Sequence, residues 1–333
     1  MADVGNDYFM RYVYRGEEGE LIPEEATHIT VAEDVTVVLA RAFYRHRKIV
    51  EIICHDRVEK IEREAFYNCR RLRRVIIPGV KEVEECAFWD CAEPICGSRV
   101  LMDVECGKLE IINDSAFNNC RLLTSINLPS ARIVGSGAFS HTALTDVKFG
   151  NKLERIEERA FAYNCVIPNI WQSLTDALST SLERITIPLK DGLITSDDIF
   201  KECSKLKQVD LVERVELNGI IAALHLEDWR NDMNEEIDLI NRILPNARAG
   251  YYSFTNDDDG EKAQTIRTWI RSVRGKLIHY QAEHQRILNE ATTTLQLVLP
   301  RDIAMNSVLS YLALPSYTEV SLENEEDGED VIE

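Results

Sequence analysis

An Ala-Phe dipeptide recurs along this sequence at nearly constant intervals. Its copies occupy positions 42–43, 65–66, 87–88, 116–117, 138–139 and 160–161, and Ile199-Phe200 is a degenerate seventh copy. The steps between successive Phe residues are 23, 22, 29, 22, 22 and 39 residues. A period near 22 residues predicts a solenoid, because one short repeat cannot bury its apolar side alone and must stack on its neighbours.

Further positions recur in register with the Phe. A β-branched residue lies five residues before it in six copies: Val38, Ile61, Val83, Ile112, Val134 and Ile156. A cysteine follows it by three residues, or by four in one case, in five copies: Cys69, Cys91, Cys120, Cys165 and Cys203. A Leu-x-x-Val/Ile-x-Ile/Leu pattern comes next, as in Leu72, Val75 and Ile77, and its alternation predicts a short strand with one apolar face.

With these anchors the chain resembles the BspA-like class of leucine-rich repeat, whose consensus is similar to Ala-Phe-x-x-Cys-x-x-Leu-x-x-Ile-x-Leu-Pro. The resemblance covers residues 26–217 and implies a solenoid of short parallel strands, with about seven repeats, that acts as a recognition surface. Insertions near 92–103 and 166–180 account for the two long steps between Phe residues. We expect residues 1–25 to form an N-terminal cap or a flexible segment.

After residue 217 the period is lost and helical spacing takes its place. Residues 227–244 carry apolar residues on one helical face, and residues 261–299 carry an a/d-type stripe, so we predict a helical hairpin or coiled coil over 218–299. The long stripe must be buried against the shorter helix, the last repeat, a second copy or a partner. A homodimer through 261–299 is therefore one of the outcomes left open. Residues 300–333 are predicted to form a flexible acidic tail.

The net charge of −19 and the pI of about 4.9 argue against nucleic acid as a partner, since duplex binding depends on clustered positive charge. No apolar run reaches the roughly 20 residues needed to cross a bilayer, so no membrane association is predicted. The first 25 residues lack a basic start and an apolar core, so no signal peptide is expected. We expect a cytoplasmic protein, or a nuclear one.

The sequence contains no nucleophile elbow and no Gly-rich phosphate loop. Five of the nine cysteines are explained by the repeat, where free Cys acts as a small buried apolar residue. The spacing of Cys86, Cys91, Cys96 and Cys106 is wider than that of the paired ligands of structural zinc. We therefore predict a non-enzyme with no catalytic residue, no metal and no cofactor.

Residues 41–81 stand out against the acidic total, with 12 Lys or Arg and five Asp or Glu. Stacking is predicted to bring the basic residues of two successive repeats together: Arg45, Arg47 and Lys48 with Arg70, Arg71, Arg73 and Arg74. This cluster is either a solvated edge balanced by neighbouring Glu or a docking site for an acidic or phosphorylated segment. Outward strand positions, among them Asn127, Lys148 and Arg184, are predicted to contribute to a mixed face of the kind that binds protein.

The function these features favour is a non-catalytic protein–protein interaction module, in which the solenoid recognises a protein partner. One alternative is a homo-oligomeric scaffold that assembles through the C-terminal coiled coil. A weaker alternative is an acidic histone-type chaperone, suggested by the acidic tail. The sequence does not identify the partner.

Overall fold

A computed structural model describes residues 9–91, 102–163, 182–250 and 260–299. Two compact units are present: the solenoid unit comprises Met1–Val212 with Asp238–Ser272, and the helical unit comprises Glu213–Ile237 with Val273–Glu333. Most of the insertion predicted near 92–103, all of that near 166–180, and the tail 300–333 lie outside the described residues.

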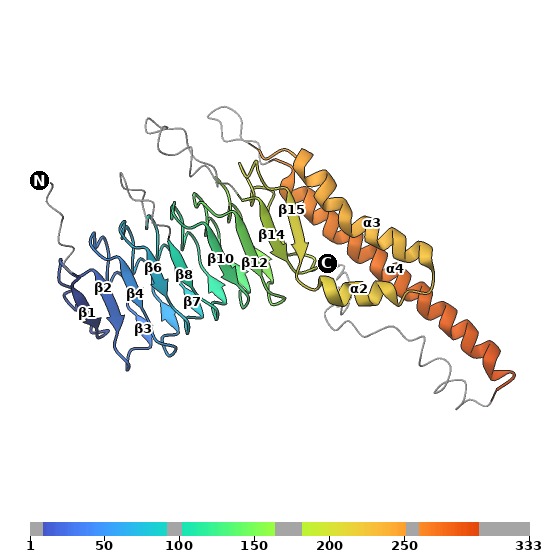
Figure 1. The fold of residues 1–333 in the computed structure, drawn as a ribbon, viewed down its shortest axis with the longest axis horizontal. Helices are drawn as coiled ribbons and strands as arrows, with labels where there is room; N and C mark the ends of the chain where they lie inside the picture. Colours follow the sequence, from blue (N-terminus) through green and yellow to red (C-terminus); the bar gives the residue numbers. More distant parts are fainter. Residues whose placement is uncertain (1–8, 92–101, 164–181, 251–259, 300–333) are drawn as a thin grey trace, which may run out of the picture. The chain divides into compact units, whose positions relative to one another are not determined.

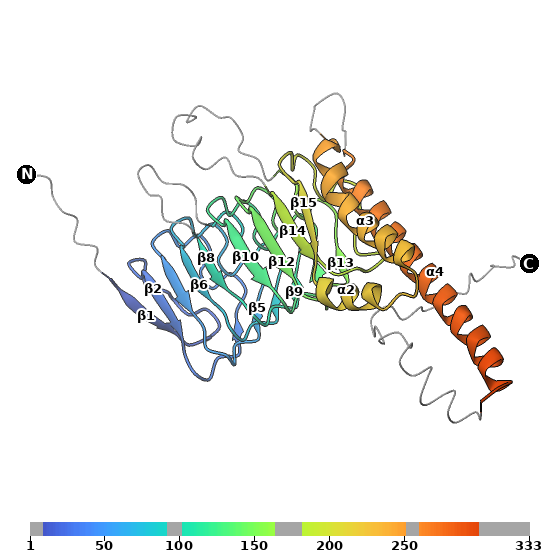
Figure 2. The same cartoon turned by 45° about the vertical axis from the view of Figure 1, so that its right-hand side comes forward.

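The solenoid unit is built from three parallel sheets, as Figures 1 and 2 show. The first sheet has the order β1 (Arg11–Tyr14), β2 (His28–Val31), β4 (Glu51–Ile53), β6 (Arg74–Ile76) and β8 (Asp103–Glu105). The second contains β10 (Ser125–Leu128), β12 (Asp146–Phe149), β14 (Arg184–Ile187) and β15 (Gln208–Leu211). The third contains β13 (Arg155–Ile156), β11 (Ile133–Val134), β9 (Ile111–Ile112), β7 (Glu82–Val83), β5 (Lys60–Ile61) and β3 (Val37–Val38). The predicted solenoid of short parallel strands is confirmed.

The recurrent Phe residues form one continuous stack through the core. Successive rings lie 4.8 to 5.9 Å apart with nearly parallel planes, and each ring is at most 1% exposed. Tyr14 ends the stack at the N-terminal side, 5.1 Å from Phe43, and its hydroxyl accepts the N–H of Leu39 at 3.1 Å. In the first six copies, the β-branched residue five positions before the Phe is fully buried in the third sheet. The core is thus a column of equivalent side chains.

A left-handed backbone recurs on both sides of the first six repeat Phe residues and after Phe200. Twelve described non-glycine residues have φ between 53° and 62°, and each lies two residues before or after a repeat Phe. They are Arg41, Arg45, Glu64, Asn68, Cys86, Asp90, Ser115, Asn119, His141, Arg159, Tyr163 and Glu202. This conformation costs roughly 1–2 kcal/mol per L-residue. Hydrogen bonds between repeats offset the cost, as where Arg45 N–H donates to the carbonyl of Tyr67 at 2.7 Å.

The repeat cysteines do more than fill space. Each described thiol donates a hydrogen bond of 3.0 to 3.1 Å to the Phe carbonyl of the preceding repeat: Cys69 to Phe43, Cys91 to Phe66, Cys120 to Phe88 and Cys203 to Phe161. Burial raises the pKa of the Cys69 and Cys120 thiols. Cys69 and Cys120 therefore act as protonated structural donors. Cys165 lies outside the described residues.

The C-terminal helices are α2 (Arg214–Ala222), α3 (Glu227–Ile243), the 3-10 turn η1 (Leu244–Asn246) and α4 (Lys262–Gln296). The hairpin of α3 and α4 is confirmed, whereas α2 and η1 were not predicted. Within the helical unit, Trp229 stacks on Tyr280 with ring centroids 5.2 Å apart, and Asp232 accepts hydrogen bonds from Lys276 and Tyr280. The α4 stripe around Tyr280 thus packs on α3 of its own chain.

Candidate binding surfaces of the solenoid

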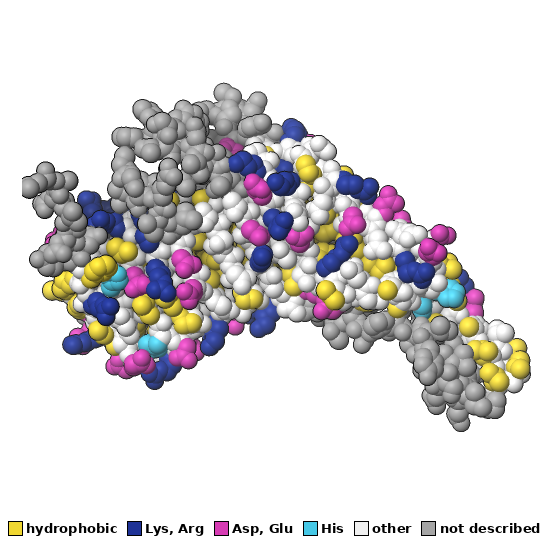
Figure 3. Space-filling model, viewed as in Figure 1, with side chains coloured by type: hydrophobic (Ala, Val, Ile, Leu, Met, Phe, Trp, Pro, Cys, Tyr) yellow, Lys and Arg dark blue, Asp and Glu magenta, His cyan; other side chains and the backbone are white. Residues whose placement is uncertain are grey.

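Two rows of side chains cross the outer face of the first sheet. Strand register aligns one row of polar and charged residues: Arg11, His28, Glu51, Arg74 and Asp103. The second row contains Val13, Thr30, Ile53, Ile76 and Glu105. Val13 is 51% exposed, and Ile53 and Ile76 are partly exposed. We name Val13, Ile53 and Ile76 the apolar row; Figure 3 shows apolar side chains among charged ones over these N-terminal strands.

Arg74, one of the predicted site residues, belongs to this sheet face. Its guanidinium pairs with the Glu51 carboxylate at 2.9 Å and with Glu105 at 3.7 Å. The pair with Glu51 follows from parallel register, which puts Glu51 of β4 beside Arg74 of β6, and Ile53 beside Ile76. Glu51 and Arg74 of the charged row therefore compensate each other, and they border the apolar row.

The outer face of the second sheet carries the predicted residues Asn127, Lys148 and Arg184. Arg184 donates to the Gln208 side chain at 3.1 Å and lies 3.6 Å from the Asp210 carboxylate. Lys148 lies 3.8 Å from Asp146. In contrast to the first sheet, the outward positions of the second sheet are polar throughout: Ser125, Asn127, Asp146, Lys148, Arg184, Thr186, Gln208 and Asp210.

The predicted basic cluster divides into different environments. Lys48 pairs with Glu25 at 2.6 Å, and Arg70 pairs with Asp90 at 3.3 Å. Arg73 is only 8% exposed and donates to the carbonyls of Leu72 and Arg70, both at 2.9 Å; burial lowers its pKa. It therefore does not present its charge on the surface.

The remaining members of the cluster are Arg45, Arg47 and Arg71, and all three are exposed. No ion pair involving them is found within residues 9–91, 102–163, 182–250 and 260–299. Neighbouring carboxylates thus compensate the charges of Lys48, Arg70 and Arg74, but not those of these three arginines.

An aromatic row lies on the turns, one residue after each of the first three repeat Phe residues. Tyr44 stacks on Tyr67 with centroids 5.1 Å apart, and Tyr67 stacks on Trp89 at 6.2 Å. The guanidiniums of Arg45 and Arg41 lie over the Tyr44 ring, 5.2 and 5.6 Å from its centroid. The sequence signal was the aromatic residue at the same repeat position in three copies, and this row was not among the predicted binding residues.

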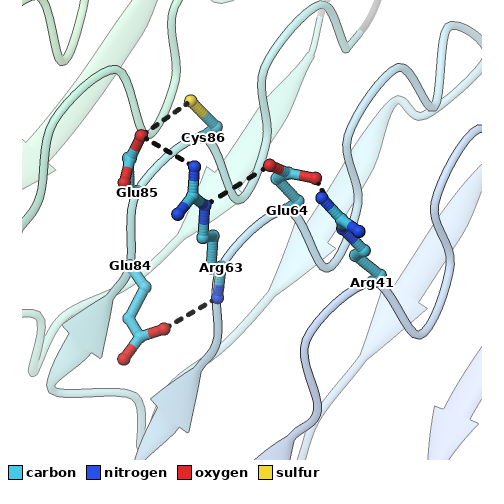
Figure 4. Close-up of polar contacts among 6 residues, drawn as sticks. All are labelled: Arg41, Arg63, Glu64, Glu84, Glu85 and Cys86. Atoms are coloured by element: carbon cyan, nitrogen blue, oxygen red, sulfur yellow. Dashed lines mark hydrogen bonds and ion pairs between the residues drawn. The ribbon is translucent and has the colours of Figure 1, made fainter.

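Ion pairs join successive repeats beside this row, as Figure 4 shows. Glu64 accepts from Arg41 at 2.8 Å and lies 3.3 Å from Arg63, which also pairs with Glu85 at 3.3 Å. The hydrogen bond from Arg41 lowers the pKa of Glu64. Backbone N–H of Arg63 donates to the Glu84 carboxylate at 2.8 Å. In this network of two arginines and three glutamates, each arginine is paired with at least one glutamate.

Within the described ranges, no group of three or more His, Cys, Asp or Glu side chains is arranged to hold a metal ion. Of the helices in those same ranges, none combines the length and apolar character needed to cross a bilayer.

Parallel strands stacked around a Phe column, with one short repeat per layer, define a leucine-rich-repeat solenoid. The solenoid is of the BspA type: the family described as BspA type leucine rich repeat region matches residues 24–95 and 96–178, in six copies. Regions of this family generally mediate protein–protein interaction or surface binding and are generally non-catalytic scaffolds.

Solved leucine-rich-repeat proteins resemble the chain in structure. The leucine-rich-repeat protein of T. pallidum is 21% identical, with coverage of 45% of this chain and 82% of that one, and a TM-score of 0.33. A protein of Bacteroides ovatus is 19% identical, with coverage of 57% and 62% and a TM-score of 0.24. A leucine-rich cell surface protein of Faecalibacterium prausnitzii is 18% identical, with coverage of 56% and 60% and a TM-score of 0.23. The chain spans less than two thirds of the latter two, and no curated protein matches it.

Proposed function

We propose that the solenoid is a protein-recognition module and that its partner binds the outer face of the first sheet. The observation that carries this proposal is the apolar row of Val13, Ile53 and Ile76 on a solvent-facing sheet. Protein interfaces combine an apolar centre with a polar rim, and the charged row beside the apolar row supplies such a rim.

The second sheet supplies an internal comparison. Solvent-facing positions of a sheet are ordinarily polar, and the outward positions of β10, β12, β14 and β15 follow that rule. Two isoleucines and a valine in the matching positions of the first sheet depart from it. Full burial of such a side chain contributes about 1.5–3 kcal/mol, and a partner that covers the exposed part of each side chain in the row gains the corresponding share of that free energy.

Exposed arginines lie on the turns of the same repeats, so the partner we propose presents an acidic or phosphorylated segment to them. The solenoid in this proposal is non-catalytic and acts through its surfaces alone. The homo-oligomeric scaffold and the chaperone alternatives have no comparable observation in their favour.

The test replaces the apolar row while leaving the core intact. Ile53→Glu/Ile76→Glu places two carboxylates on the outer face, and Asn127→Glu/Thr186→Glu adds the same charges at outward positions of the second sheet. We expect cross-linking and mass spectrometry in native extract to show proteins captured by wild type and by the second-sheet variant, and lost in the first-sheet variant. Equal capture by all three would refute the proposed face. Capture by none, with a dimer in light scattering, would favour the scaffold.

A further inference from the structure

We propose that the turns of the first three repeats form a second contact site, which binds an Asp- and Glu-rich segment of the partner. The site is the aromatic–arginine edge: Tyr44, Tyr67 and Trp89 with Arg45, Arg47 and Arg71. The inference rests on the proposed protein-recognition function, but it uses different residues from the sheet face and is tested separately.

Ring stacking decides what the edge presents to a partner. Tyr67 has Tyr44 on one face and Trp89 on the other, at 5.1 and 6.2 Å. The Tyr44 ring also carries the guanidinium of Arg45 over it at 5.2 Å. The two tyrosine rings thus have their faces occupied, while Trp89 has Tyr67 on one face. What the tyrosines leave accessible is ring edge, and the edge of an aromatic quadrupole is its positive part. Tyr hydroxyls and the Trp N–H add hydrogen-bond donors to it.

The charged side chains of this edge are positive, like the ring edges. Arg45, Arg47 and Arg71 are exposed, and within the part of the chain that the structure describes they have no carboxylate partner. Elsewhere on these repeats the cations are matched, as in Lys48–Glu25 and Arg70–Asp90. Three uncompensated arginines on a chain of net charge −19 mark a local site for anions.

The distribution of these groups points to several carboxylates. Arg45 and Arg47 belong to the first repeat, Arg71 to the second, and Trp89 to the third. Donors spread over three repeats match a segment with successive acidic side chains better than a single phosphate group. Single-stranded nucleic acid binds by stacking its bases on open aromatic faces, and here the faces of Tyr44 and Tyr67 are covered.

Fluorescence anisotropy tests the assignment with a labelled peptide of about 12 residues in which Glu alternates with Ser, at about 0.1 M salt. Arg45→Gln/Arg47→Gln/Arg71→Gln is expected to raise the Kd by about tenfold or more, because each lost guanidinium removes a charge-assisted contact. Tyr67→Phe keeps the stack and removes one hydroxyl donor, so we expect a smaller rise, of about threefold.

The matched control is Arg121→Gln/Arg132→Gln/Arg155→Gln, which removes the same charge from later repeats and should leave the Kd unchanged. Equal loss of binding in this control would overturn the site, since net charge alone would then explain the effect. A phosphoserine peptide of equal net charge that binds about tenfold more tightly, or an equally charged oligothymidylate that binds as well as the Glu peptide, would overturn the carboxylate assignment. If no variant affects peptide binding while capture still depends on Ile53 and Ile76, this inference fails, and protein recognition through the face of the first sheet stands.

Discussion

The Nζ atom of Lys262 donates a hydrogen bond of 2.6 Å to the carbonyl oxygen of Leu206, in the last repeat. A second bond, of 3.0 Å, goes to the carbonyl of Leu244 in η1. Lys262 is 2% exposed, and burial lowers its pKa. One side chain at the start of α4 thus satisfies carbonyls of two segments within the solenoid unit. A lysine in the first turn of a helix would ordinarily be solvated.

Lys262→Met is expected to lower the free energy of unfolding by about 2–3 kcal/mol, because the methionine fills the space but leaves two buried carbonyls without this donor. Urea denaturation measures the loss. Lys152→Met, at an exposed position of the solenoid, should change stability by less than about 0.5 kcal/mol. Equal stability of the two variants would show that the Lys262 hydrogen bonds contribute no net free energy.

Gly79→Ala tests the close approach of successive turns. A Cβ at Gly79 would lie 2.0 Å from the carbonyl oxygen of Asp56, which is backbone and cannot rotate away. We expect a loss of about 3 kcal/mol or more in unfolding free energy. At Gly107 a Cβ meets nothing within 4 Å, so Gly107→Ala should be close to neutral in the same thermal or urea unfolding experiment. A neutral Gly79→Ala would contradict the turn packing.

His141 predicts a dependence of stability on pH. It stacks on Tyr163 with centroids 4.9 Å apart, and burial, followed by the charge of Arg121, lowers its pKa below the ordinary value. The folded state therefore favours the neutral ring, and this contribution is complete above about pH 6.5 and declines as pH falls through the folded pKa.

The comparison uses His141→Asn, since Asn tolerates the φ of 56° at this position. Wild type is expected to lose more unfolding free energy than this variant between about pH 7.5 and pH 5. Chemical denaturation at the two pH values gives the difference, in which titrations common to both proteins cancel. Identical pH slopes would remove His141 as the cause.

The buried thiols predict resistance to alkylation. Burial raises the pKa of Cys54 and Cys106 to about 12, so little thiolate forms near neutral pH. Iodoacetamide at about pH 8 should therefore leave Cys54, Cys69, Cys106 and Cys120 unmodified in the folded protein and modify them in urea. Peptide mass mapping measures the extent at each cysteine. Rapid labelling of Cys69 or Cys120 without denaturant would show that the core opens readily.

The placement of the arginines shows how far the sequence could locate a site. Side chains alternate between the two faces of a strand, which puts Arg73 on the same side as Val75 and Ile77. The burial of Arg73 could therefore have been predicted from the sequence. The exposure of Arg71 and the pairing of Arg74 with Glu51 depend on neighbouring repeats, since the partners are 23 residues apart in sequence. The aromatic row had a sequence signal in its shared repeat position, but its stacking and the guanidinium over Tyr44 required the three-dimensional arrangement.

The sequence by itself determined the repeat, the buried positions and the two long helices, because each repeat places the same apolar residues at the same offsets from its Phe. Burial of those residues is common to all layers and is therefore visible as a period. Only the tertiary structure decided which charges are compensated, that thiols donate to Phe carbonyls one repeat away, and that Lys262 is buried at Leu206. These contacts join residues distant in sequence, and their geometry depends on the register in which the layers stack.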